Sequence, residues 1–563
     1  MKKKGFTLVE LLAVIVILAV IALIATPTIL GVIEKSRKGA ANSSALGYID
    51  ALEKQIAINE MDTSKTSISD GIYHVGEIDI SYKGKGPVDG NYVIEKGIVT
   101  KGIFLFGEYY VCYSENKVTS NKDENKLTDC SDIAENVEYK ETILNGAYPK
   151  ISGELVPVTI EDNGVVKKAD INSKWYSYKE KKWANAVILV DNTISYEDGE
   201  EIPESNIESY FVWIPRYKYK LFDLGEYTST ISEQPETSIA KTIEIVFGTD
   251  TTSDSNSGEC TTPLTSGETG ECEVGEYMTH PAFITMNTNG LWVGKYETGY
   301  SGATSAEEAQ ITSDDSSKII VKPNVYSWRY NDTYNTFVAA YNYNRELDSH
   351  MMKNTEWGAV AYLSHSKYGI NTEININNNS DYITGYSQIN KATCFSKISE
   401  ECNQYGTTED ITQAYNTETG YQASTTGNIT GIYDMSGGAH EYMASYVDGA
   451  YGSSGFDSTT IALYNSKYFD IYASDSNHVT YNNRILGDAT GEMGPFYYYQ
   501  DNDESNHRHN NWYADSSDFV ASNYPWFGRG GHYSFGVLTG QFRFVRGVAD
   551  VSDVAGSRLV LVS

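Results

Sequence analysis

The hydrophobic and polar positions of this chain set its first 30 residues apart from the rest. No polar side chain occurs between Leu11 and Ala25. The mostly apolar segment 6–30 spans 25 residues, which is roughly 37 Å as an α-helix and enough to cross a hydrocarbon core of about 30 Å. Lysines at positions 2–4 precede the segment, and positive charge of this kind stays on the cytoplasmic side. The pattern predicts a transmembrane helix whose N-terminus faces the cytoplasm.

One acidic residue interrupts this segment. Glu10 lies inside the apolar run, where an ionised carboxylate costs about 2.5–3.5 kcal/mol on an insertion scale. A buried charge of this cost normally has a partner of opposite charge. We therefore expect Glu10 to contact a cation.

The periodicity continues beyond the apolar run. Apolar residues recur mostly at three- and four-residue spacings, which predicts an amphipathic helix to about residue 60. These apolar residues are Ile29, Leu30, Ile33, Ala40, Ala41, Leu46, Ile49, Leu52, Ile56 and Ile58. Alternation of apolar and polar residues then predicts strands at 71–80, 91–100 and 103–113. We expect these strands to form a small head, residues 61–145, on which the helix packs.

The rest of the chain is richer in aromatic residues. Segments 174–178 and 183–189 are expected to pair as an aromatic hairpin, and residues 146–205 are expected to lead into a large domain, 206–563. Long helix, small antiparallel sheet and large irregular domain together predict an α+β fold class.

Composition restricts the function. The formal net charge is −32, which argues against nucleic acid as a partner because nucleic-acid binding needs a basic face. An acidic balance suits a soluble surface domain and calcium ligation.

The six cysteines form three pairs that lie close together in the sequence: Cys112 with Cys130, Cys260 with Cys272, and Cys394 with Cys402. This spacing predicts three disulfides in an oxidising compartment, with free thiols as the alternative.

The motif Gly5-Phe6-Thr7-Leu8-Val9-Glu10 before an apolar helix resembles the leader of type IV pilins and pseudopilins. The resemblance implies that prepilin peptidase cuts after Gly5, so that residues 1–5 are a leader and 6–60 the pilin helix. Phe6 then becomes the N-methylated terminus, and the terminal ammonium of a neighbouring subunit is the partner of Glu10. A secretory signal peptide and a plain membrane anchor are the alternatives.

A second resemblance spans the large domain. Glu356-Trp357, Tyr433-Asp434-Met435, Arg529-Gly530-Gly531 and the closing Arg558-Leu559-Val560 occur in the order found in formylglycine-generating-enzyme-like domains, which have a C-type-lectin-like fold. The chain departs from that family: Gly438 replaces the usual Asn, and His440 and Tyr442 replace tryptophans. The oxidising members bind copper through two cysteines near the C-terminus, whereas the last cysteine here is Cys402. We therefore expect the fold without the enzyme activity.

Two kinds of binding follow from this resemblance. Family members hold calcium at a turn that corresponds here to Glu441 with Gly437 and Ala439, so calcium is the one cofactor considered; hard oxygen ligands suit it.

Glycines and aromatics near the C-terminus frame a chemically mixed set of residues, as on a rigid recognition scaffold. We expect these to bind the ligand: His532, Tyr533, Phe535, Val537, Leu538, Gln541, Arg543, Val545 and Arg546. Variable proteins of diversity-generating retroelements have the same fold and diversify this part of it, so the resemblance implies that this chain is such a protein; an ordinary exposed edge region is the alternative.

These expectations combine into one hypothesis. The chain is a minor, tip-located pilin that is anchored in the cell membrane before assembly and then displays a non-catalytic lectin-like adhesion domain on the cell surface. A bulky head of this size would crowd a repeating shaft. Its partners are other pilin subunits, prepilin peptidase and a surface ligand, glycan or protein. The alternatives are a pseudopilin of a secretion or DNA-uptake machine and a surface enzyme with a modified formylglycine-type site.

Overall fold

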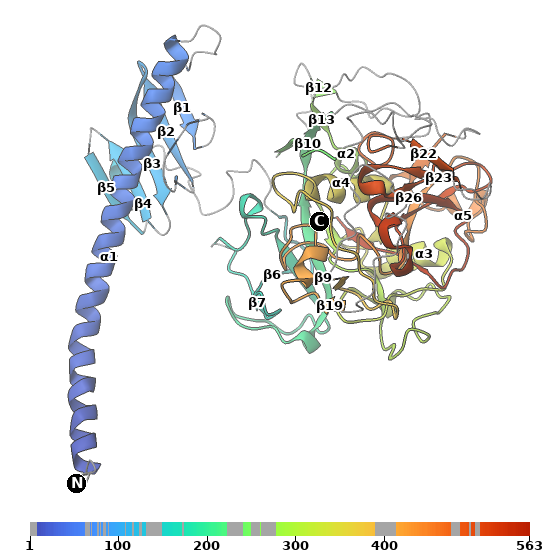
Figure 1. Cartoon of the computed structure of the whole chain (residues 1–563), viewed down its shortest axis with the longest axis horizontal. Helices are drawn as coiled ribbons and strands as arrows, with labels where there is room; N and C mark the ends of the chain where they lie inside the picture. Colours follow the sequence, from blue (N-terminus) through green and yellow to red (C-terminus); the bar gives the residue numbers. More distant parts are fainter. Residues whose placement is uncertain are drawn as a thin grey trace. The chain divides into compact units, whose positions relative to one another are not determined.

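The structure is a computed structural model. It describes residues 8–61 and, with short gaps, 68–130, 149–221, 240–248, 259–260, 277–388, 412–473, 485–494, 497–500 and 507–562; side chains are described from residue 34 onward, again with gaps. The chain divides into two compact units, Met1–Ile143 and Leu144–Ser563 (Figure 1). The unit boundary lies close to the head boundary expected at residue 145.

The first unit consists of one long helix and one sheet. Helix α1 spans Leu8–Met61, and the five strands are β1 (Gly71–His74), β2 (Asp89–Glu95), β3 (Ile98–Phe106), β4 (Tyr109–Ser114) and β5 (Lys117–Asn121). Each strand pairs antiparallel with the next one in the chain. The C-terminal part of α1 lies along this sheet (Figure 1).

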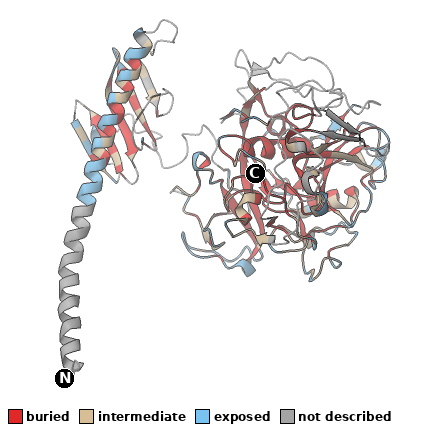
Figure 2. Cartoon of the chain, in the orientation of Figure 1, coloured by how far each residue is buried: buried red, intermediate tan, exposed pale blue. Residues whose placement is uncertain are grey.

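One face of α1 packs on the sheet, and it differs in part from the predicted face. The buried residues of the helix recur at spacings of three and four residues, which places them on one helix face. They are Ala41, Ala45, Tyr48, Ile49, Leu52 and Ile56. They pack against Tyr92 and Phe104 of the sheet. Leu46 and Ile58, predicted to be buried, are 46% and 48% exposed. Figure 2 shows the buried face on the sheet side.

The strand predictions for the head were too long. Predicted strand 91–100 is a hairpin, because β2 ends at Glu95 and β3 starts at Ile98. Lys96 (φ 53°) and Gly97 (φ 77°) form the two-residue connection, and positive φ at both positions is the geometry that joins twisted antiparallel strands. Predicted strand 103–113 also contains a reversal, between Phe106 and Tyr109.

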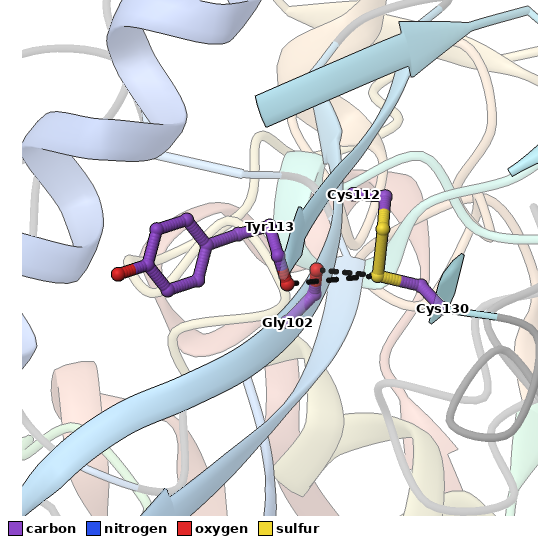
Figure 3. Close-up of a disulfide and its surroundings, with 4 residues drawn as sticks. All are labelled: Gly102, Cys112, Tyr113 and Cys130. Carbon is purple, nitrogen blue, oxygen red and sulfur yellow. Dashed lines mark hydrogen bonds between the residues drawn. A yellow bond between two sulfur atoms is a disulfide. The ribbon is translucent and has the colours of Figure 1, made fainter. Parts of the chain in front are cut away.

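A disulfide closes the end of the head. Cys112 on β4 is bonded to Cys130, 18 residues later, and both residues are buried. Cys130 Sγ lies 3.2 Å from the carbonyl oxygen of Gly102 and 3.6 Å from that of Tyr113 (Figure 3). The other two predicted disulfides fall outside the described side chains: Cys260, Cys272, Cys394 and Cys402.

The second unit contains two large sheets. The first has the order β17-β28-β14-β9-β8-β6-β7 and is antiparallel throughout. Its strands are β6 (Val156–Ile160), β7 (Val166–Lys168), β8 (Asn185–Leu189), β9 (Ile207–Pro215), β14 (Gly290–Gly294), β17 (His350–Met351) and β28 (Leu559–Leu561). The last strand of the chain is therefore interior to this sheet.

The second large sheet has the order β21-β20-β25-β26-β24-β23-β22, with β27 paired to β20. Its strands are β20 (His440–Val447), β21 (Asp470–Tyr472), β22 (Tyr497–Gln500), β23 (His507–Asn510), β24 (Ser516–Ser517), β25 (Trp526–Gly530), β26 (Gly540–Gly547) and β27 (Ala555–Gly556). Strands β20, β25 and β26 are consecutive and antiparallel.

Smaller elements complete the unit. A four-stranded sheet contains β10 (Tyr217–Lys220), β11 (Ile245–Phe247), β12 (Glu259–Cys260) and β13 (Tyr277–Thr279); two pairs are β15 (Gly299–Tyr300) with β16 (Ile319–Ile320) and β18 (Tyr386–Gln388) with β19 (Thr412–Ala414). The helices are α2 (Pro281–Met286), α3 (Thr333–Tyr343), α4 (Asn354–Ser364) and α5 (Ser458–Ile461).

Residues 146–205 belong to the large unit and do not form a separate connecting region. Strands β6, β7 and β8 hydrogen-bond within the same sheet as β9. The predicted pairing of 174–178 with 183–189 is wrong beyond its tip: Ser177 pairs with Lys182, but β8 pairs with β6 and β9. Strand β8 pairs within the seven-stranded sheet and not with residues 174–178, because all five residues of β8 are buried in that sheet.

Helix α4 lies in the centre of the large unit. All eleven of its residues are buried. Its start is fixed by Glu356, whose Oε2 accepts the backbone N–H of Lys353 at 2.9 Å, a capping-box bond that satisfies an otherwise unpaired helix donor. The motif Glu356-Trp357 thus lies in the first turn of this helix, and Trp357 is completely buried.

Replacing both cysteines of the head, Cys112→Ser with Cys130→Ser, should destabilise the first unit by about 3 kcal/mol, because the open chain regains the entropy of an 18-residue loop. Calorimetry of the full exported chain should show a lower unfolding temperature for the first unit and an unchanged transition for the second. Two unchanged transitions would contradict the structural role of the bridge.

Candidate ligand-binding face and its buried charged support

The four motifs of the large domain meet in space. The Trp357 indole N–H of α4 donates to the carbonyl oxygen of Gln541 on β26 at 2.7 Å. The guanidinium of Arg529, on β25, lies 5.5 Å from the Trp357 ring centroid. Arg558, just before β28, reaches the turn that carries Tyr433 and Glu441. Motifs up to about 200 residues apart thus surround one point of the core.

A buried ion pair holds this point together. Arg558 donates from Nη2 to Glu441 Oε1 at 2.6 Å and from Nε to Oε2 at 3.0 Å, and both side chains are fully buried. Arg558 also donates to the carbonyl oxygens of Gly294 (2.9 Å) and Tyr433 (3.0 Å). Burial raises the pKa of Glu441 to about 7, while the adjacent guanidinium opposes that rise. The pair joins β28, β14 and β20 through one side chain.

Two further carboxyls share this region. Glu297 accepts the Ser327 hydroxyl on Oε2 and the Ala439 N–H on Oε1, the latter at 2.9 Å. Asp434 Oδ1 accepts from Asn377 Nδ2 and from the Gly385 N–H, each at 2.9 Å. Burial first, and then the charges of Asp434 and Glu441, raise the pKa of Glu297 well above its ordinary value. The Arg558 guanidinium therefore interacts electrostatically with all three buried carboxyls.

The glycine turn, residues 437–439, is shaped around Glu297. Gly437 and Gly438 both have left-handed backbones, with φ of 82° and 68°. A Cβ on Gly438 would lie 2.3 Å from Glu297 Oε1, closer than real Cβ contacts allow. The Gly438 that departs from the family pattern is thus the residue that makes room for the carboxyl of Glu297.

Lys295 is the buried cation on the other side of Tyr433. Its ammonium donates to Asn185 Oδ1 (2.9 Å) and to the carbonyl oxygens of Ile429 (2.7 Å) and Gly431 (2.8 Å). Burial lowers its pKa well below the ordinary value. Three acceptors match the three donors of an ammonium, so this lysine fixes the segment that leads into the glycine turn.

The glycine turn carries the predicted ligand-binding segment. We call residues 531–539, between β25 and β26, the display loop; the 3₁₀ helix Tyr533–Leu538 lies within it. The Tyr533 N–H donates to the Gly438 carbonyl at 3.0 Å, and Gly438 N donates to the Asn377 carbonyl at 2.8 Å. The buried carboxyls therefore hold the turn, and the turn holds the loop.

Three side chains stack on this loop. The rings of His532 and Phe535 have centroids 3.7 Å apart. The guanidinium of Arg543 lies 4.5 Å from the Phe535 centroid and donates to the Leu538 carbonyl at 2.8 Å. Burial, followed by the charge of Arg543, lowers the pKa of His532 to about 4. The stack presents aromatic and cationic groups at one place.

The predicted ligand-binding residues do not all join this stack. Phe535 is 36% exposed, and His532, Tyr533, Leu538, Val545 and Arg546 are partly exposed. Gln541 and Arg543 are buried, at 2% and 6% exposed. The side chain of Val537 lies outside the described residues. Arg546 pairs with Asp518 at 3.0 Å and lies over the Tyr524 ring, so it faces another partner.

Other contributors to the face were not predicted. His440 begins β20, and the space beside Gly528 that a Cβ would fill holds its imidazole. Tyr382 contacts Tyr533 edge-on at 5.1 Å, and Arg329 stacks on Tyr382 at 3.8 Å. No periodicity in the sequence connects these distant positions. The complementarity of Glu297 to Gly438 is likewise visible only in three dimensions.

The calcium site predicted at Glu441, Gly437 and Ala439 has competing contacts. Both carboxylate oxygens of Glu441 accept from Arg558, and the Ala439 N–H donates to Glu297. Within the described part of the chain, no group of three or more His, Cys, Asp or Glu residues has an arrangement that could hold a metal ion. Calcium binding stays a prediction.

The processing and assembly residues fall outside these contacts. Gly5 and Phe6 lie outside the described residues, and Glu10 is in α1 with its side chain undescribed. Among the residues that the structure describes, no helix has both the length and the apolar character needed to span a membrane.

Comparison with known proteins concerns the N-terminus. Residues 1–26 match the family model of the prokaryotic N-terminal methylation motif. No curated protein matches the chain. The N-terminus of the chain is therefore like that of type IV pilins and pseudopilins. This motif implies a membrane-anchored precursor, processing by a prepilin peptidase, and assembly with other pilin subunits at the surface.

The fit between Gly438 and Glu297 predicts a large difference between two glycine substitutions. Gly302 also has a left-handed φ, 87°, but nothing lies within 4 Å of a Cβ there. Gly302→Ala should therefore cost only the backbone strain, about 1–2 kcal/mol. Gly438→Ala should cost a further 1–3 kcal/mol because the buried carboxyl must move. Equal losses in urea unfolding would show that Glu297 does not fill this space.

Removing one side of the buried ion pair should be costly. Glu441→Gln leaves the Arg558 guanidinium buried without its anion, and the expected loss is about 3–5 kcal/mol of unfolding free energy. Glu161→Gln is the control, because Glu161 pairs with Lys167 at the surface and such pairs contribute little. Denaturant titration of the second unit measures both. Similar values for the two variants would mean that the Arg558–Glu441 pair does not support the fold.

Proposed function

We propose that this protein is a minor type IV pilin that displays a non-catalytic ligand-binding domain on the cell surface. The observation that carries the proposal is the display loop. Its backbone is tied to the glycine turn by the Tyr533–Gly438 hydrogen bond, while Ser534 and Phe535 are exposed. A fixed backbone with exposed, chemically mixed side chains is suited to recognition.

The N-terminal half of the proposal rests on the methylation motif and on the first unit. The motif supplies Gly5, Phe6 and Glu10 in the positions used for cleavage, methylation and subunit contact. A long helix packed on a small antiparallel sheet, closed by a disulfide, is an arrangement suited to export and packing of helices in a filament.

The tip location is part of the proposal because of size. The second unit spans residues 144–563, about three times the length of the first. A repeating shaft would have to accommodate this unit at every subunit. One copy at the end of a filament avoids that crowding and presents the display loop to the surroundings.

The resemblance to formylglycine-generating-enzyme-like, lectin-like domains supports binding over catalysis. The motifs quoted for that resemblance converge around Arg558, Glu441 and Trp357, as parts of one fold are expected to do. The 161 residues after Cys402 contain no cysteine, so the thiolates that copper needs are missing from the matching positions. Diversification of the display loop by a retroelement belongs to the same proposal.

A pseudopilin of a secretion or DNA-uptake machine is the second candidate, because its N-terminal motif is the same. The two differ in where the chain is found. Immunogold labelling of the second unit should mark the ends of extended surface filaments. Labelling confined to the cell envelope, with no extended filament, would favour the pseudopilin.

Processing is the most direct test of the shared part. The exported chain should begin with N-methylated Phe6 in intact-mass and N-terminal peptide measurements, and Gly5→Leu should accumulate the full-length precursor in the membrane. Lys4→Ala is the control and should be processed normally. An exported protein that retains Met1, or that starts well after Phe6, would overturn the pilin assignment.

A further inference from the structure

The face around the display loop contains an unbroken series of rings between two guanidiniums. Arg329 stacks on Tyr382 at 3.8 Å, and Tyr382 contacts Tyr533 at 5.1 Å. His532 follows, 5.9 Å from Tyr533 and 3.7 Å from Phe535. Arg543 closes the series over Phe535 at 4.5 Å. We call these six residues the cationic-aromatic series.

Polar nitrogen atoms accompany the rings. His532 Nδ1 lies 3.0 Å from the Ser534 hydroxyl, and its Nε2 has no hydrogen-bond partner among the described residues. The His440 imidazole, next to Gly528, likewise makes no hydrogen bond to any residue that the structure describes, and it is partly exposed. Both imidazoles therefore keep hydrogen-bonding capacity for a ligand.

Two arginines lie in this face although the whole chain is acidic. The protein carries a formal charge of −32, yet Arg543, Arg329 and two histidines gather here. Asp553, which is exposed, acts on His532 and Arg329. Glu297 and Glu307 also act on Arg329, and Asp515 acts on Arg543. Asp515 accepts the Phe542 N–H at 3.0 Å, and burial raises its pKa to about 7, so its charge offsets Arg543 only in part.

We infer that the cationic-aromatic series binds a carboxylated sugar, with Arg543, His532 and His440 placed around the carboxylate. The inference rests on the proposed function and names the chemical class of its ligand. A guanidinium and imidazole N–H groups form charge-assisted hydrogen bonds to a carboxylate. The exposed part of Phe535 and the neighbouring Tyr533 offer apolar surface for the C–H groups of a sugar ring.

The charge distribution favours one carboxylate over a polyanion. A chain with a charge of −32 repels a long polyanion over distances comparable to the Debye length, about 8–10 Å at physiological salt. A single carboxylate on a compact ring senses mainly the local cations. An acidic peptide or polyglutamate is therefore the less favoured partner, and it is one outcome of the test.

Protonation adds an independent signature. The pKa of His532 is lowered to about 4 and that of His440 to about 3 by burial, with Arg543 acting on both. A bound carboxylate favours the protonated imidazoles and raises both pKa values. Affinity for a carboxylated sugar should therefore increase as the pH falls from 7 toward 5, and affinity for a neutral sugar should not.

The experiment uses the full exported chain, captured on a biosensor, with oligosaccharides that end in glucuronic acid or in sialic acid. Their methyl esters and the neutral parent sugars are the probes without charge; the two acidic termini distinguish the two sources of the same carboxylate. We expect one or both acidic probes to bind at least about tenfold more tightly than their esters. Arg543→Gln should remove this advantage.

Two further variants keep the result interpretable. Arg345→Gln removes a guanidinium that also stacks on a tyrosine, at 3.6 Å from Tyr341, and should bind as the wild type does. His532→Gln leaves Arg543 in place and should abolish the increase at low pH even if Arg543→Gln fails to fold. Equal binding of acid and ester, or equal binding of poly-L-glutamate, would overturn the inference.

Failure of the inference is distinguishable from failure of the proposed function. If attachment of cells to their natural surface is lost in the Phe535→Ala variant while no acidic sugar binds, the display loop binds a ligand of another class and only the inference is wrong. If attachment does not change in Phe535→Ala, His532→Gln and Arg543→Gln, the display loop is not the binding face and the proposed function itself is wrong.

Discussion

The second unit depends on one buried ion pair. Arg558, which precedes β28 in one large sheet, donates two charge-assisted hydrogen bonds to Glu441, the second residue of β20 in the other large sheet. Such a pair is expensive to desolvate and is stable only when every donor and acceptor is satisfied. Here two further N–H groups of Arg558 donate to the carbonyl oxygens of Gly294 and Tyr433. The chain can satisfy this guanidinium only when strands from distant parts of the sequence have assembled.

This core interaction extends to the surface through short connections. Two acceptors fix the glycine turn: the Glu297 carboxyl accepts the Ala439 N–H, and the Asn377 carbonyl accepts the Gly438 N–H. The Gly438 carbonyl in turn accepts the first N–H of the 3₁₀ helix in the display loop. A loop held in this way keeps its backbone while its exposed side chains change.

Local patterns predicted some elements well and could not predict others. The helix face of α1 followed from three- and four-residue spacings, but Leu46 and Ile58 fit that spacing only loosely and proved exposed. The reversal at Lys96-Gly97 was missed because the alternation of apolar residues continues through it. Glycines and aromatics near the C-terminus are a local signal, and from them we predicted that the segment of the display loop binds a ligand, which stays a prediction. Its partners Tyr382, Arg329 and His440 come from remote segments, and the space left by Gly438 for Glu297 is a property of packing alone.

The central claim is that the buried carboxyls hold the glycine turn, and through it the display loop. Amide hydrogen exchange measures this directly in the Glu297→Ala variant, which removes the acceptor of the Ala439 N–H. The account predicts faster exchange in the peptide that contains Tyr533, with unchanged exchange in β9, which lies in the other sheet. Unchanged protection at Tyr533 would contradict the account, because the loop would then keep its conformation without the charged support beneath it.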